Sequence, residues 1–132
     1  MITEDFCSLE VAKLLKEKGF DELCIFKYSS EGVRMKAGVA IDEWQNSELD
    51  DDECSCVSHQ MAMKWLREVH NIMVSPYALS LGYYFEIFDL TTKDITGCKP
   101  LYKVGIPSKE DVLSTYEEAI EAGIKYCLEN LI

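Results

Sequence analysis

The sequence predicts an α+β fold of two layers, in which three amphipathic helices pack on a mostly antiparallel sheet. The expected strands follow one another in runs and do not alternate strictly with helices, which is typical of antiparallel sheets. Each expected helix places its apolar residues at spacings of three and four, on the side that would face a sheet. The expected order is helix, two strands, helix, two or three strands, helix. A three-layer α/β fold is the alternative.

The first helix is expected over residues 9–18. Ser8 can cap its first turn, because a serine side chain accepts a hydrogen bond from a free backbone N–H there. Gly19 suits the left-handed conformation in which many helices end, and Phe20 can then pack back on Leu15. Both ends of this helix are therefore predicted.

The second helix is expected over residues 58–70. The third is expected to begin after Ser114, because Ser114 and Glu117 have the spacing of a capping box. The second helix has four core-facing residues: Ala62, Trp65, Leu66 and Val69. Its water-facing residues are Lys64, Arg67 and Glu68. The third helix has a longer stripe: Tyr116, Ile120, Gly123, Ile124, Cys127, Leu128 and Leu131.

A β-hairpin is expected from residues 23–28 and 33–39, joined by the turn 29–32. Apolar and basic residues alternate along its second strand: Val33, Arg34, Met35, Lys36 and Ala37. Because neighbouring side chains point to opposite faces of a strand, this pattern predicts one buried face and one wet face.

Further strands are expected over 72–74, ending near Pro76, over 83–90 and over 101–104, with a turn at 91–94. Aromatic residues gather around the central strand: Tyr77, Tyr83, Tyr84, Phe85 and Phe88. Successive aromatics would point to both faces of this strand, so either both faces are buried or a partner covers one. The core interpretation is favoured.

The length predicts a single domain over residues 1–132, with an acidic, mobile loop at about 41–57. The net charge is −11, from 24 acidic and 13 basic residues. Nucleic-acid binding and attachment to an anionic membrane are not expected, because both need clustered Lys and Arg. The start has no basic and apolar leader, and no apolar run approaches the ~18 residues of a membrane span. We expect a cytoplasmic protein.

Six cysteines are present: Cys7, Cys24, Cys54, Cys56, Cys98 and Cys127. Several lie inside apolar patterns, where a reduced cysteine behaves as a small hydrophobic residue. Without a secretion signal, free thiols are favoured over a disulfide framework.

A metal or thiol site would draw on Cys54, Cys56 and His59, with His70 as a fourth ligand. Helix geometry separates the two histidines by about 16 Å, which is too far for one zinc ion. His70 suits capping of the helix C-terminus, where a protonated imidazole is favoured. Neighbouring carboxylates disfavour a thiolate at Cys54 or Cys56. We therefore assign no catalytic, cofactor-binding or metal-binding residue and no cofactor.

The acidic segment does not match a calcium-binding loop. Counted from Asp50, its sixth and twelfth positions are Ser55 and Met61, where an EF-hand needs glycine and glutamate. Trp44 lies within this segment, and it is the best single candidate for an exposed interface anchor.

Three stretches of the sequence, 12–20, 64–70 and 115–123, resemble a set of small proteins in Bacteroides-type gut bacteria and in their phages and mobile elements. The resemblance covers about a quarter of the chain. It implies an accessory or mobile-element role, and the set offers no established activity, cofactor or site residue.

The sequence therefore favours a small non-enzymatic accessory protein that acts by protein–protein contact, with an unidentified protein partner or as a homodimer. One alternative is an acidic DNA mimic that inhibits a DNA-binding enzyme, which the net charge suggests. The other is a thiol or metal-dependent activity at Cys54, Cys56 and His59.

Overall fold

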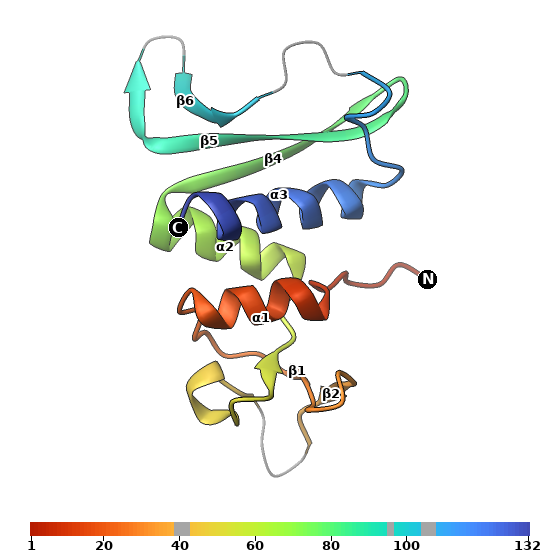
Figure 1. Ribbon diagram of the computed structural model, residues 1–132, viewed down its shortest axis with the longest axis vertical. Helices are drawn as coiled ribbons and strands as arrows, with labels where there is room; N and C mark the ends of the chain where they lie inside the picture. Colours follow the sequence, from red (N-terminus) through yellow and green to blue (C-terminus); the bar gives the residue numbers. More distant parts are fainter. Residues whose placement is uncertain (39–42, 95–96, 104–107) are drawn as a thin grey trace. The chain divides into compact units, whose positions relative to one another are not determined.

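The computed structural model describes residues 1–38, 43–94, 97–103 and 108–132. These residues form an α+β protein with three α-helices and two antiparallel three-stranded sheets, so the expected fold class is confirmed (Figure 1). The chain divides into two compact units, Met1–His59 and Gln60–Ile132, called unit 1 and unit 2 below. The single domain expected over 1–132 stays a prediction. No helix of the described residues has the length and apolar character to cross a membrane.

Unit 1 begins with helix α1, Leu9–Glu17, and both of its predicted ends are confirmed. The Ser8 side chain accepts a hydrogen bond from the N–H of Val11 at 3.3 Å. At the other end Gly19 adopts φ +93°, and the N–H of Phe20 donates to the carbonyl of Leu15 at 2.9 Å. This is the Schellman ending expected from the glycine.

The sheet of unit 1 has the order β2-β1-β3. Its strands are β1 (Phe26–Tyr28), β2 (Arg34–Lys36) and β3 (Cys54–Ser55). The hairpin of β1 and β2 is confirmed, although both strands are shorter than expected, and residue 39 of the expected strand lies outside the described residues. β3 was not expected. It pairs with β1 and packs against α1, so the sheet lies next to the helix on its β3 side.

The expected burial of one face of β2 is wrong. Val33 is 58% exposed and Met35 47% exposed, and all three residues of the strand are exposed. β2 is an edge strand, and within the described residues the side chains of Val33 and Met35 are left largely open to solvent. Alternation of apolar and basic residues shows that a strand has two chemically different faces. It does not show that another element packs over either face.

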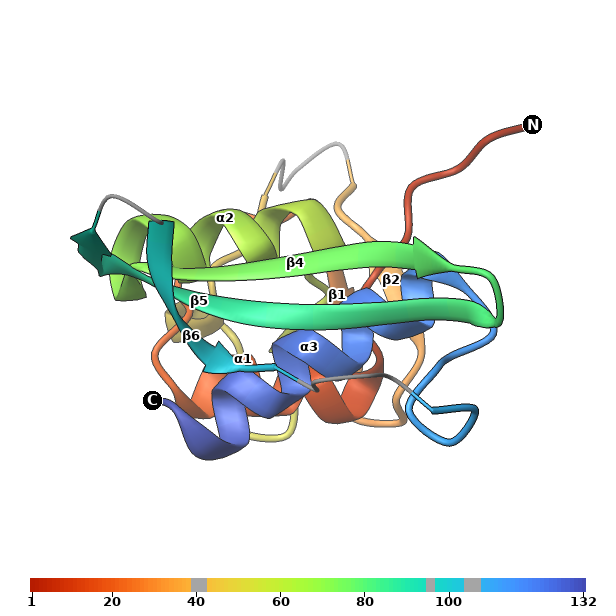
Figure 2. The same ribbon diagram turned by 90° about the horizontal axis from the view of Figure 1, so that it is seen from above.

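Unit 2 is a sheet with helices on one side. The strands β4 (Ile72–Leu79), β5 (Gly82–Asp94) and β6 (Gly97–Tyr102) pair in that order. Helices α2 (His59–His70) and α3 (Tyr116–Asn130) lie on the same side of this sheet (Figures 1 and 2).

Two expected strand ends in unit 2 are wrong. β4 continues through Pro76 to Leu79, which is tolerated because β4 is an edge strand and needs no outward N–H. β5 continues through the expected turn at 91–94. In place of a turn, the pairing of β5 with β6 shifts register between Asp89 and Lys93. There the carboxylate of Asp89 accepts hydrogen bonds from the N–H and the hydroxyl of Thr91. β6 begins four residues before the expected strand at 101–104, whose last residue lies outside the described ones.

The N-cap of α3 lies one residue later than expected, and the reciprocal hydrogen bond goes to the residue before the cap and not to the cap itself. Thr115 is the cap, and its hydroxyl accepts from the N–H of Glu118 at 3.1 Å. The Glu118 carboxylate accepts in turn from the N–H of Ser114. The expected stripe is buried from Ile120 to Leu128. α3 approaches the sheet so closely that a Cβ on Gly123 would lie 2.6 Å from Val74.

The stripe of α2 also differs at one end. Ala62, Trp65 and Leu66 are buried as expected, but Val69 is 54% exposed. Met63, which was not assigned to the stripe, is buried in its place. Burial therefore stops before the last turn of the helix.

Candidate protein-interaction surface

The three residues of the expected thiol or metal site are not brought together. Cys54 begins β3 and Cys56 directly follows its end, where the N–H of Cys56 donates to the carbonyl of Phe26 at 3.0 Å. Among the described residues, the sulfurs of these cysteines and a nitrogen of His59 do not lie within 4.8 Å of one another. A four-coordinate zinc ion needs ligands about 2.0–2.3 Å from one point.

The thiols of unit 1 are also poorly suited to nucleophilic chemistry. All six cysteines of the chain are free, and five are buried. Burial raises the pKa of Cys24 to about 11, and burial likewise raises the pKa of Cys54 and of Cys56. Lys16 and Lys13 oppose this effect at Cys54 without reversing it. Because the thiolate is the reactive form, these residues are held in the unreactive one.

The two histidines occupy opposite ends of α2, which keeps them apart as helix geometry predicts. The backbone N–H of His59 donates to the carbonyl of Asp5 at 3.0 Å. The ring of His70 packs edge-on against Trp65, with 4.6 Å between ring centroids. Capping by His70 stays a prediction.

The described part of the acidic segment, residues 43–57, is folded against the rest of unit 1. It contains a 3-10 turn, Asn46–Glu48, as well as β3. Buried Asn46 joins two parts of the unit, because its amide donates to the carbonyl of Phe20 at 2.7 Å and accepts from the N–H of Ser55 at 2.8 Å. Residues 41–42 of the expected loop lie outside the described residues.

Two lysines also hold this segment. The ammonium of Lys16 donates to the carbonyls of Asp50 and Glu53 at 2.8 and 2.6 Å. Lys27 forms an ion pair with Glu53 at 2.7 Å, and that hydrogen bond lowers the pKa of the carboxyl. Trp44 is half-buried with the Lys27 ammonium 5.0 Å from its ring centroid, so it is not the freely exposed anchor that was expected.

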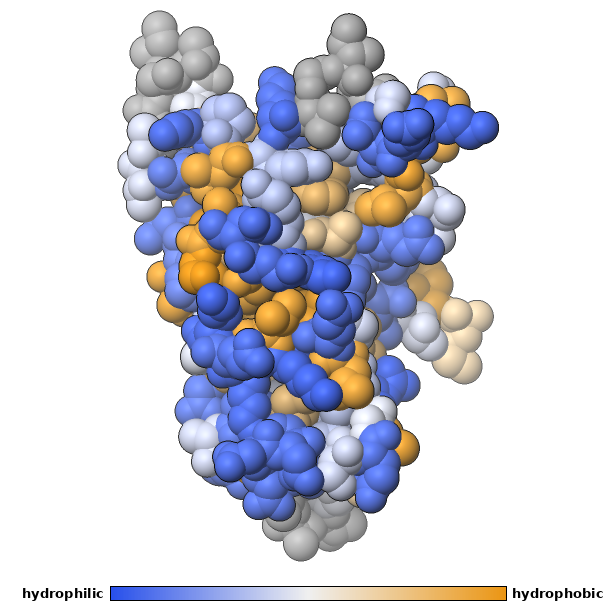
Figure 3. Space-filling view, in the orientation of Figure 1, coloured by the Kyte–Doolittle hydropathy of each residue, from blue (hydrophilic) through white to orange (hydrophobic). Residues whose placement is uncertain are grey.

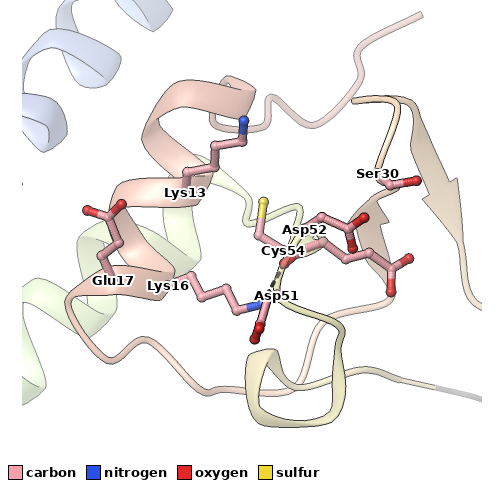
Figure 4. Close-up of a pocket in the computed structure, with 8 residues that line it drawn as sticks. Lys13, Lys16, Glu17, Ser30, Asp51, Asp52 and Cys54 are labelled. Carbon is pink, nitrogen blue, oxygen red and sulfur yellow. Dashed lines mark hydrogen bonds between the residues drawn. The ribbon is translucent and has the colours of Figure 1, made fainter.

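A pocket of about 480 Å³ lies between α1 and the segment that leads into β3 (Figure 4). Lys13, Lys16 and Glu17 of α1 form one side, and acidic residues 51–53 and Cys54 form the other. Both charge signs are interleaved, and the Lys16 donors already bind main-chain carbonyls. The ammonium of Lys16 is therefore already engaged within unit 1 and is not left for an anion in this pocket.

Aromatic residues of unit 2 pack against one another within that unit. The rings of Phe85 and Tyr102 stack with centroids 4.8 Å apart, and Tyr102 contacts Tyr126 of α3. On the opposite face of β5, Tyr84 is buried and packs on Tyr77. The buried rings support the core interpretation of this strand.

Within the described residues, an exposed apolar surface is found instead on unit 1. Val33 and Met35 lie on one face of the hairpin with Ile25, which is 46% exposed, and we call these three residues the β1–β2 apolar face. Hydrophilic residues cover most of the molecular surface seen in Figure 3, with hydrophobic residues exposed between them. The sequence contained the signal for this face, the alternation along β2, but not the fact that it is uncovered.

Comparisons with protein-family models, curated proteins and solved structures find no significant match for the chain. The interpretation of this surface therefore depends on its own geometry and charge.

Proposed function

We propose that this protein is a small non-enzymatic accessory protein that acts by binding another protein chain, and that unit 1 supplies the contact. The observation that carries the proposal is the β1–β2 apolar face. Its three large side chains are each close to half exposed and lie on one side of a two-stranded hairpin. Covering an exposed side chain of this size contributes on the order of 1 kcal/mol, so a partner over all three would gain a useful part of its binding free energy.

The polar chemistry of unit 1 supports a binding role over a catalytic one. Its candidate thiols have raised pKa values, and Lys16, Lys27 and Glu53 are engaged in holding the acidic segment. The unidentified partner can be another protein or a second copy of the chain.

Solution mass and capture of partners from the source cell test this proposal. The variant Val33→Ser/Met35→Ser removes most of the apolar face, and Leu81→Ser changes a comparably exposed leucine of unit 2 as the matched control. We expect the first variant to lose the dimer or the captured protein and the control to retain it. A strict monomer that retains no partner would contradict the proposal.

A further inference from the structure

The outer edge of β2 presents backbone groups that no described strand uses. The N–H of Ser29 donates to the carbonyl of Val33, and the N–H of Ala37 donates to the carbonyl of Ile25, so Val33 and Ala37 face β1. Hydrogen-bonding direction alternates along an antiparallel strand, so the N–H and C=O groups of Arg34 and Lys36 point away from β1. β2 is the last strand in the sheet order. Four backbone groups are therefore open to pairing.

The side chains of the same two residues lack an acidic partner within the described part of the chain. Neither Arg34 nor Lys36 forms an ion pair there, although the sequence holds 24 acidic residues. The Arg34 guanidinium instead lies over the rings of Phe6 and Phe26, at 4.8 and 5.3 Å from their centroids. A guanidinium held over aromatic rings in this way can still offer its N–H donors to a carboxylate.

The space beside Arg34 is open. A hollow of about 630 Å³ is lined by Phe26, Tyr28, Arg34 and residues 3–6. Glu4 and Asp5 belong to this lining, yet neither comes within ion-pair distance of Arg34. A carboxylate brought by another chain would find the guanidinium accessible.

From these observations we propose that the outer edge of β2 binds an extended acidic segment of another protein as an added strand. The proposal rests on the proposed function and names the chemistry of the partner. Addition of a strand to an exposed edge gives affinity through main-chain hydrogen bonds and specificity through alternate side chains.

The register of β2 defines the partner sequence. Partner residues opposite Arg34 and Lys36 lie on the face that carries the two cations, so they are acidic. The residue between them lies on the other face, beside Val33 and Met35, so it is apolar. The segment therefore alternates acidic, apolar, acidic.

A second copy of β2 does not fit this edge. The antiparallel registers that join the open backbone groups put Arg34 opposite Arg34, Arg34 opposite Lys36, or Lys36 opposite Lys36. Like charges directly opposite each other destabilise a strand pair. The two cations thus disfavour self-pairing and favour an acidic strand.

The test uses the full chain and short labelled peptides, with binding followed by fluorescence anisotropy. One peptide has a core of alternating glutamate and valine, and the control peptide has the same composition in blocks. We expect the alternating peptide to bind more tightly, and its affinity to fall as salt is added. On binding, the amide protons of Arg34 and Lys36 should become protected from hydrogen exchange, whereas that of Met35, which already faces β1, should change little.

Three variants separate charge from backbone pairing. Lys36→Pro removes an outward N–H, and Arg34→Glu reverses the stacked cation; each should weaken binding by about tenfold or more. Lys109→Glu reverses an exposed charge of unit 2 and should leave binding unchanged. Circular dichroism checks that each variant is folded, and Arg34→Glu keeps every backbone donor in case the proline disturbs the hairpin.

Absence of binding to the folded wild-type protein, or binding that survives both β2 variants, overturns the edge proposal. If a captured partner still depends on Met35 in that case, the proposed function stands while the acidic-strand proposal falls. If the peptide does not bind and no captured partner depends on Met35, both the acidic-strand proposal and the proposed function fall.

Discussion

Asn46 joins two parts of unit 1 through one buried side chain. Its single side chain satisfies the carbonyl of Phe20, just after α1, and the N–H of Ser55 in β3. Both hydrogen bonds are buried, so loss of the amide would leave a donor and an acceptor without partners and without water.

Replacement of Asn46 by alanine should lower the free energy of unfolding by roughly 2–4 kcal/mol, since each orphaned buried group costs about 1–2 kcal/mol. Asn130→Ala removes an exposed side-chain hydrogen bond and serves as the control, with an expected change within about 0.5 kcal/mol. Urea unfolding measures both. Equal midpoints for the two variants would show that Asn46 does not join the parts of unit 1.

At the scale of single elements, the local signals in the sequence were reliable where local chemistry decides the outcome. The ends of α1 follow from a capping serine and a glycine, and the structure contains both. β3 could not be predicted, because a two-residue strand inside an acidic run is created by its pairing with β1 and not by its own sequence. The β1–β2 apolar face was missed for a related reason, since coverage of a strand depends on elements distant in the sequence.

Gly123 gives a test at this scale. Gly123→Ala places a methyl group 2.6 Å from Val74 Cγ1 and 3.3 Å from Phe85 Cδ2, so α3 has to move away from the sheet. Overpacking costs about 1–3 kcal/mol and exceeds or offsets the gain of about 1 kcal/mol in helix propensity. We expect a net loss of up to about 2 kcal/mol in the free energy of unfolding, measured by thermal or urea unfolding.

Two further variants identify the cause. Gly38→Ala adds a methyl group with no heavy atom within 4 Å and should be nearly neutral. Val74→Ala removes the clashing methyl group, so the double variant with Gly123→Ala should lose less stability than the sum of the single losses. Strict additivity would show that Val74 is not the obstacle.

For the whole molecule, buried thiols link stability to alkaline pH. Burial raises the pKa of Cys127 from 9.0 to about 12 and that of Cys24 to about 11. At a pH between 9.0 and these raised pKa values, the buried thiols of the folded chain keep protons that the same thiols release in the unfolded chain. Stability is therefore full below pH 9 and falls as the pH rises towards the folded-state values.

Each such thiol should contribute a loss of up to about 1.4 kcal/mol per pH unit above pH 9. Urea unfolding at pH 8, 9.5 and 10.5 measures the slope for the wild-type protein and for Cys127→Ala. We expect a shallower decline in the variant, whatever its stability at pH 8. Parallel declines in the two proteins would exclude Cys127 as a source of the pH dependence.

Pro76 has a consequence for solubility. β4 reads Ile-Met-Val-Ser-Pro-Tyr-Ala-Leu, an uncharged, strongly β-forming stretch at a sheet edge. Without the proline it would have the composition of segments that stack into steric zippers. Its ring lies where the backbone would present an N–H away from β5, because Pro76 is opposite Phe85 in a pair that makes no mutual hydrogen bonds. Pro76 thus acts as a gatekeeper that interrupts the unpaired edge of β4 and disfavours growth of further strands along it.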